Sequence, residues 1–125
     1  MPSVILAVDD SESIRQMVRH TLEGAGYSVV QACDGAAALD YAKSKGVDLV
    51  LTDINMPKLD GIELCKELRE LPHYKGVPIL MLTTESEPEA KSRGKQAGAT
   101  GWLVKPFNPT QLLATLARVL SVNPT

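Results

Sequence analysis

Five short apolar runs, each followed by a stretch with helical spacing of apolar residues, constrain this chain more than any other feature. The runs occupy residues 4–8, 28–30, 48–52, 78–82 and 101–104. Most of them are continuous rather than alternating, which is typical of strands that are covered on both faces in a parallel sheet. Strands that alternate with helices in this way predict an α/β domain with right-handed crossovers.

The stretches between the runs show the pattern of amphipathic helices. Residues 11–26 predict a helix with Ser11 as its N-cap and with Gly24 and Gly26 at its end. Further helices are predicted over residues 35–46, 60–71 and 87–97 and from residue 108 onward, with Asp60 and Asn108 as caps. The helix over residues 87–97 is the weakest of these, because it contains a proline, an internal glycine and few large apolar residues.

Length and composition exclude several classes of protein. A chain of 125 residues with 44% hydrophobic residues predicts a single domain over residues 1–125, and we expect no output domain. The net charge of −2 argues against nucleic-acid binding. The sequence shows neither a signal peptide nor an apolar stretch long enough to span a bilayer, so we expect a cytoplasmic protein that does not insert into membranes. The two cysteines, Cys33 and Cys65, form no metal-binding or redox pattern, and we expect both to be buried.

Polar and charged residues follow four of the five predicted strands. Asp9 and Asp10 come after the first strand, Asp53 ends the third, Thr83 ends the fourth and Lys105 ends the fifth. Taken singly, each has an ordinary interpretation as a helix cap, a turn residue, a strand-forming threonine or a surface lysine. Ligands of open parallel sheets bind outside the carboxyl ends of the strands, so these residues are predicted to converge on one edge of the sheet.

The combination of these residues indicates phosphoryl transfer. Three carboxylates close together repel one another unless a cation is present, and oxygen ligands of this kind suit Mg²⁺. An ionised aspartate can act as a nucleophile and form an aspartyl-phosphate. The Lys105 ammonium and the Thr83 hydroxyl can then neutralise and hydrogen-bond the phosphoryl oxygens.

Over essentially its whole length, the chain resembles the response-regulator receiver domains. The resemblance is carried by Asp9-Asp10, by the segment 53–57 (Asp-Ile-Asn-Met-Pro) with Gly61 after it, by Thr83-Thr84 and by the segment 105–107 (Lys-Pro-Phe). It implies a flavodoxin-like (βα)₅ fold with strand order 2-1-3-4-5, a histidine kinase as phosphoryl donor and Asp53 as the phosphoacceptor.

The resemblance also assigns roles to individual residues. Mg²⁺ would be bound by Asp10, Asp53 and the backbone carbonyl of Asn55, with Asp9 helping through water. Asn55 and Glu85 would tune the loss of the phosphoryl group, and the Lys105–Pro106 bond would be cis. The chain would promote its own phosphorylation and slow dephosphorylation, without being an enzyme in the ordinary sense.

Among receivers, the segment 97–107 is most similar to that of stand-alone chemotaxis receivers. Trp102 stands where those proteins usually have tyrosine. We expect a monomer. Phosphorylation would draw the Thr83 hydroxyl toward the phosphoryl oxygen, and Trp102 would turn inward into the space that is vacated. The output face would consist of the fourth helix, fifth strand and fifth helix, including Lys91 and Lys95, and would bind a downstream protein such as a flagellar switch protein. Alternatively, Trp102 is a half-buried packing residue with its indole N–H in water, and the two lysines are ordinary solvated residues.

Other functions remain open at this point. A phosphorelay intermediate would pass the phosphoryl group on to a histidine phosphotransfer protein. A haloacid-dehalogenase-type enzyme is disfavoured because its nucleophile follows the first strand, and a flavin-nucleotide binder because no Ser/Thr/Gly-rich phosphate loop follows that strand. A receiver that works without phosphorylation is disfavoured because Asp9, Asp10, Asp53, Thr83 and Lys105 are all present.

Overall fold

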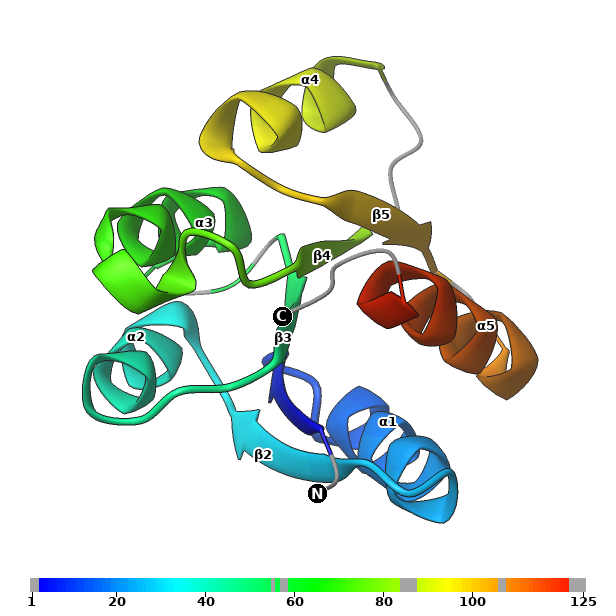
Figure 1. Cartoon of the computed structure of the whole chain (residues 1–125). Helices are drawn as coiled ribbons and strands as arrows, with labels where there is room; N and C mark the ends of the chain where they lie inside the picture. Colours follow the sequence, from blue (N-terminus) through cyan, green and yellow to red (C-terminus); the bar gives the residue numbers. More distant parts are fainter. Residues whose placement is uncertain (1–2, 55, 57–58, 84–87, 106–107, 122–125) are drawn as a thin grey trace.

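Five parallel strands form one sheet at the centre of the molecule (Figure 1). The structure is a computed structural model that describes residues 3–54, 56, 59–83, 88–105 and 108–121. The strands are β1 (Val4–Val8), β2 (Ser28–Ala32), β3 (Leu49–Asp53), β4 (Ile79–Thr83) and β5 (Gly101–Val104). Their order in the sheet is β2-β1-β3-β4-β5, which confirms the predicted fold class and strand order.

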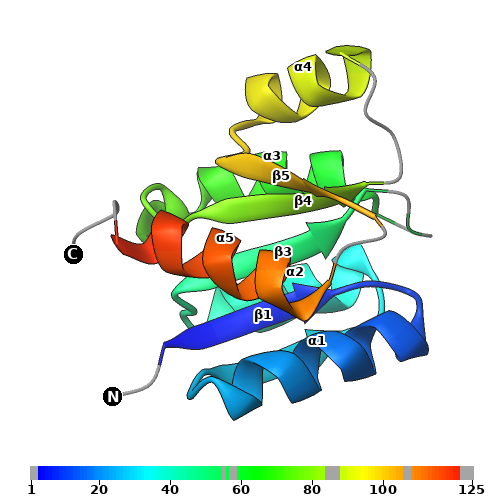
Figure 2. The same ribbon diagram turned by 90° about the vertical axis from the view of Figure 1, so that its right-hand side faces the viewer.

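Helices cover both faces of the sheet. Helices α1 (Glu12–Gly24) and α5 (Pro109–Ser121) lie on one face, and α2 (Gly35–Ser44) and α3 (Gly61–Glu70) lie on the other (Figure 1). Helix α4 (Pro88–Ala97) lies next to α3, beside the β5 edge of the sheet. Figure 2 shows the carboxyl ends of the strands at one side of the molecule.

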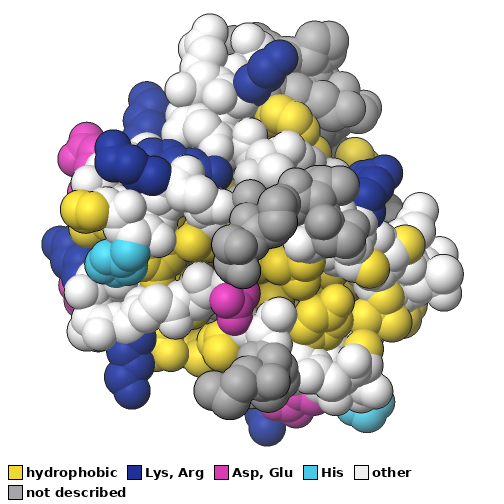
Figure 3. Space-filling model, viewed as in Figure 1, with side chains coloured by type: hydrophobic (Ala, Val, Ile, Leu, Met, Phe, Trp, Pro, Cys, Tyr) yellow, Lys and Arg dark blue, Asp and Glu magenta, His cyan; other side chains and the backbone are white. Residues whose placement is uncertain are grey.

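Burial follows the position of each strand in the sheet. Every residue of β3 and β4 is buried, as the continuous apolar runs predict for strands covered on both faces. The edge strands β2 and β5 are only partly buried. The face of the molecule in Figure 3 shows apolar side chains between the helices, with Lys and Arg side chains scattered around them.

The predicted caps are confirmed where the helices begin. The Ser11 hydroxyl accepts a hydrogen bond from the Ile14 N–H at 3.3 Å, and Asp60 accepts one from Glu63 at 2.8 Å. Asn108 and Gln111 cap α5 reciprocally, because each side chain accepts a hydrogen bond from the backbone N–H of the other.

Several predicted boundaries were wrong by a few residues. Helices α1 and α2 end two residues earlier than predicted, at Gly24 and Ser44, and β2 continues to Ala32 because its pairing with β1 extends that far. Gly26, with φ +98°, lies in the turn after α1 instead of inside the helix. The predicted start of α4 at residue 87 lies outside the described residues.

The structure also contains features that the sequence did not reveal. A short 3₁₀ helix (Pro72–Tyr74) places the Tyr74 ring in the core, and the Tyr74 hydroxyl donates to the Lys45 carbonyl at 2.7 Å. Cys65 is buried as predicted, but the same prediction for Cys33 was wrong, because Cys33 follows the edge strand β2 and is exposed.

Within the described part of the chain, no helix has both the length and the apolar character needed to cross a membrane.

Candidate functional site

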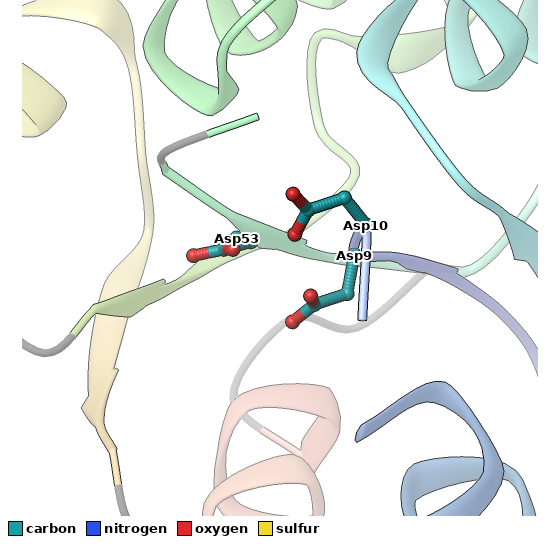
Figure 4. A group of neighbouring side chains, drawn as sticks. All are labelled: Asp9, Asp10 and Asp53. Carbon is teal, nitrogen blue, oxygen red and sulfur yellow. The ribbon is translucent and has the colours of Figure 1, made fainter. Parts of the chain in front are cut away.

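Three aspartates meet at the carboxyl edge of the sheet. Asp9 and Asp10 follow β1 and Asp53 ends β3, and Figure 4 shows the three side chains leaving these neighbouring strand ends. One carboxylate oxygen from each lies within 4.8 Å of the others. Asp9 and Asp53 are buried, whereas Asp10 is exposed. The predicted convergence of these carboxylates is therefore confirmed.

Lys105 lies between two of these carboxylates. Its Nζ is 3.0 Å from Asp9 Oδ2 and 3.4 Å from Asp53 Oδ1, and its side chain is only 13% exposed. Its backbone N–H donates to the carbonyl of Thr83 at 2.7 Å, which ties the end of β5 to the end of β4. Thr83 itself is buried, and its backbone contact makes it a neighbour of Lys105 at this edge of the sheet.

The two carboxylates that follow β1, those of Asp9 and Asp10, differ in their hydrogen-bond and ion-pair partners within the protein. Asp9 Oδ1 accepts the Ser11 N–H at 2.9 Å, and Asp9 Oδ2 accepts the Lys105 ammonium. Both oxygens of Asp9 therefore have protein partners. The carboxylate of Asp10 faces solvent at the mouth of the site, where a cation can reach it.

The environment of Asp53 disfavours the charged form of its carboxylate. Burial raises its pKa above the ordinary value of 3.8, and the charge of Asp9 raises the pKa further, whereas Lys105 and the Ile54 N–H lower it. A divalent cation would offset both the burial and the repulsion. Hard carboxylate oxygens at this spacing form the donor set that Mg²⁺ prefers, so the residues present fit a Mg²⁺ ion.

Gly61 packs against the backbone of the phosphoacceptor candidate. Its N–H donates to the Ile54 carbonyl at 2.8 Å, and a Cβ at this position would lie 2.2 Å from the Asp53 carbonyl oxygen. Any side chain would therefore push the start of α3 away from the backbone of Asp53. The sequence showed this glycine as part of a motif, but it did not show the contact that requires a glycine there.

Trp102 packs against α4 on the same face of the sheet as Thr83. Trp102 pairs in register with Met81, and both contact the core beneath α2, α3 and α4. Because side chains alternate along a strand, Thr83 points to the same face as Met81. A Cβ at Gly94 would lie 3.1 Å from Trp102 Nε1, so this glycine leaves room for the indole ring.

The indole N–H of Trp102 is buried. Within the described residues, Nε1 has no hydrogen-bond partner, so the interpretation that places this N–H in water was wrong. An unsatisfied buried donor costs on the order of 1–3 kcal/mol. Because of this cost, the ring can leave its observed position more easily.

Helix α4 buries only small residues among those whose burial is described. These residues are Gly94 and Ala97, which agrees with the prediction of a loosely held helix.

Four predicted features lie outside the described part of the structure. They are the backbone carbonyl of Asn55, the side chain of Glu85, the side chain of Lys91 and the conformation of the Lys105–Pro106 bond.

The fold and the site together define a phosphoacceptor signalling domain. The chain matches the response regulator receiver domain family over residues 5–117 and belongs to that family. Receiver domains of two-component response regulators accept phosphoryl groups from histidine kinases and bind Mg²⁺ at an acidic pocket, which in this chain is the Asp9, Asp10 and Asp53 cluster.

Solved structures show the same fold at high similarity. The chemotaxis response regulator CheY4 of Vibrio cholerae is 56% identical, with a TM-score of 0.92, and the match covers 95% of this chain and 99% of that one. The receiver domain of the sensor histidine kinase PA1611 from Pseudomonas aeruginosa PAO1, with a magnesium ion coordinated in its active-site cleft, is 30% identical, with a TM-score of 0.90 and coverage of 97% and 99%.

Curated relatives include longer regulators. The alkaline phosphatase synthesis transcriptional regulatory protein PhoP of Bacillus subtilis is 42% identical over 120 residues, which are 96% of this chain and 49% of that protein. The chain thus spans about half the length of this relative.

We expect Asp53→Asn to stabilise the metal-free protein at neutral pH, because burial and the charge of Asp9 both disfavour the ionised Asp53 carboxylate and Lys105 keeps Asp9 as its partner. The native pKa of Asp53 is raised, so the wild type loses stability as the pH rises from 3.8 through that native pKa. The gain from Asn should therefore shrink as the pH is lowered through the same range. Urea unfolding of both proteins in the presence of a chelator, repeated over this pH range, measures the difference in their free energies of unfolding.

The exposed Asp40 on α2 provides the matched control, because Asp40→Asn removes a charge far from the cluster and should leave stability within about 0.5 kcal/mol. Added Mg²⁺ should stabilise the wild type more than Asp53→Asn. A metal-free Asp53→Asn protein that is less stable than the wild type would contradict the expectation.

Proposed function

We propose that this chain accepts a phosphoryl group on Asp53 in a Mg²⁺-dependent reaction and then signals by binding another protein. The observation that carries the proposal is the placement of a buried, desolvated carboxylate within 3.4 Å of the Lys105 ammonium and beside two further carboxylates. The family membership supports the same chemistry.

The proposed transfer forms one bond and breaks one. An oxygen of Asp53 bonds to the phosphorus of a phosphohistidine, the P–N bond breaks, and its electron pair stays on the imidazole nitrogen, which takes up a proton. Within the described residues, Asp53 Oδ1 accepts the Ile54 N–H at 2.9 Å, while no donor is bound to Oδ2. Asp53 Oδ2 is therefore the oxygen that we assign as nucleophile.

The surrounding residues have distinct roles in this proposal. Lys105 neutralises the phosphoryl oxygens, and Thr83 donates a hydrogen bond to one of them. Asp10 and Asp53, with the Asn55 carbonyl, would hold Mg²⁺, which supplies positive charge to the transferring group when bound. Asp9 has both oxygens engaged by the protein, which supports contact with the metal through water.

The test is phosphorylation of the purified chain by acetyl phosphate with Mg²⁺. We expect a mass increase of one phosphoryl group that maps to Asp53. The increase should be absent when a chelator is added before the donor, and absent in Asp53→Asn. A phosphoryl group that appears on another residue, or uptake by Asp53→Asn at the wild-type rate, would sink the proposal.

The pathway that we propose is chemotaxis, with control of the flagellar motor. The support is the 56% identity to the CheY4 protein, a match that covers 99% of that chain. The downstream protein would bind the face formed by α4, β5 and α5. A pull-down with flagellar switch components, comparing protein loaded with beryllofluoride against Asp53→Asn, tests this. If label instead passes from Asp53 to a purified histidine phosphotransfer domain and no switch component is captured, the phosphorelay function is correct.

Trp102, the one tryptophan of the chain, is expected to report on the phosphorylated state. Beryllofluoride with Mg²⁺ should change its emission saturably, because Thr83 and Trp102 lie on the same face and the ring leaves a position with an unsatisfied N–H. Asp53→Asn is the control and should show no response. Unchanged emission despite full occupancy of Asp53 would reject the Trp102 switch while leaving the phosphoacceptor role intact.

A further inference from the structure

A guanidinium group from α1 reaches back to the end of β1. Arg15 Nη1 donates a hydrogen bond to the main-chain carbonyl of Asp9 at 2.7 Å, and Arg15 Nε donates to Gln31 Oε1 at 3.3 Å. Gln31 lies on the edge strand β2, in register with Ala7 of β1. The planar guanidinium therefore spans three elements, and Arg15 itself is partly buried.

The carbonyl that Arg15 holds belongs to the peptide unit joining the two adjacent carboxylates. The Asp9 N–H, which belongs to the preceding peptide unit, donates to the Ala32 carbonyl at 3.2 Å and so ties Asp9 to the end of β2. The Ser11 N–H binds Asp9 Oδ1. These contacts fix Asp9, but within the described residues no side-chain hydrogen bond holds the exposed carboxylate of Asp10. The orientation of Asp10 thus depends on the Asp9–Asp10 peptide plane.

We propose that Arg15 is a positioning residue for the Mg²⁺ site, because it holds the Asp9–Asp10 peptide unit so that both carboxylates face Asp53. The inference rests on the proposed function. It assigns to Arg15 no contact with metal or substrate. Outer partners that orient metal ligands typically change metal affinity by roughly 10- to 100-fold when they are removed.

The sign of the effect separates positioning from simple electrostatics. A positively charged side chain near the three carboxylates repels Mg²⁺. Loss of the Arg15 charge alone would therefore tighten Mg²⁺ binding. Loss of positioning would weaken it. Arg19, one turn further along α1, pairs on the surface with Glu23 at 3.3 Å and provides a matched arginine without contact to Asp9.

The experiment compares Arg15→Gln with Arg19→Gln by titration calorimetry with Mg²⁺ on the full chain. We expect the Mg²⁺ dissociation constant to rise by about 10-fold or more in Arg15→Gln and to change by less than about twofold in Arg19→Gln, whose lost charge is exposed and screened. At saturating Mg²⁺, phosphorylation of Arg15→Gln by acetyl phosphate should approach the wild-type rate. Unchanged or tighter Mg²⁺ binding in Arg15→Gln would overturn the proposal.

A second variant and a second readout guard against a folding defect. Arg15→Lys keeps a donor that can reach the Asp9 carbonyl and should bind Mg²⁺ more tightly than Arg15→Gln; no recovery would overturn the proposal. In the metal-free proteins, exchange of the Ser11 amide hydrogen should be faster in Arg15→Gln than in Arg19→Gln, and equal exchange rates would also count against it. If the wild type binds no Mg²⁺, the proposed function fails first, and the two failures are distinguished.

Discussion

Replacing Lys105 with methionine is expected to slow Mg²⁺-dependent phosphoryl uptake on Asp53 by about 100-fold or more, the usual cost of removing one preorganised charge-stabilising donor. The Lys105 ammonium lies 3.4 Å from Asp53 Oδ1 in a site where the side chain is only 13% exposed, so water cannot replace it easily. Methionine keeps the length of the side chain and removes its charge. The rate constant with acetyl phosphate at saturating Mg²⁺ is the quantity to measure.

The same substitution should have the opposite effect on the metal. Lys105 binds Asp9 Oδ2 at 3.0 Å and competes with a cation for the cluster, so Mg²⁺ should bind Lys105→Met at least as tightly as the wild type. Lys66→Met, on the exposed face of α3, is the control and should leave both quantities unchanged. A Lys105→Met protein that is folded and is phosphorylated at the wild-type rate would refute the role that we assign to Lys105.

Replacing Gly61 with alanine is expected to lower the free energy of unfolding by about 3 kcal/mol, at the upper end of the usual cost of overpacking. The added Cβ would lie 2.2 Å from the Asp53 carbonyl oxygen and 2.9 Å from Ile54 Cα, which are both backbone atoms and cannot rotate away. The gain in helix propensity, at most about 1 kcal/mol, does not offset this. Urea unfolding followed by circular dichroism measures the change.

Gly24 provides the control for this prediction. It is the last residue of α1, and a Cβ there would meet nothing within 4 Å, so Gly24→Ala should be neutral or stabilising by up to about 1 kcal/mol. Because Gly61 touches the Asp53 backbone, Gly61→Ala should also slow phosphoryl uptake by the molecules that remain folded. A Gly61→Ala protein as stable as the wild type would refute the close packing of Gly61 on the Asp53 backbone.

The order and type of the elements could be predicted because they depend on local patterns. Continuous apolar runs indicate buried parallel strands, and the caps at Ser11, Asp60 and Asn108 mark helix starts through hydrogen bonds to residues three positions away. The ends of α1 and α2 were less predictable, because Gly26 and Gly46, which the sequence offers as stops, each lie two residues beyond the last helical residue. The 3₁₀ helix escaped prediction because its Tyr74 anchor bonds the distant Lys45 carbonyl.

The convergence of these candidate residues on one edge was also predictable, because the carboxyl ends of parallel strands share an edge. Asp9, Asp10, Asp53, Thr83 and Lys105 each follow or end a strand that the apolar pattern reveals. Arg15 was missed because nothing in its spacing on α1 distinguishes it from Arg19. Only the crossing of α1 over the sheet decides which arginine reaches β1 and which stays in solvent.

The sequence by itself determined the (βα)₅ alternation and the set of chemical groups at the edge of the sheet, because short-range periodicity and strand ends encode both. The tertiary structure alone decided which oxygens are engaged. Asp9 has two protein partners, Asp10 faces solvent, and Asp53 is buried beside Lys105. These differences arise from burial and from contacts between residues far apart in the chain, so no local pattern in the sequence could reveal them.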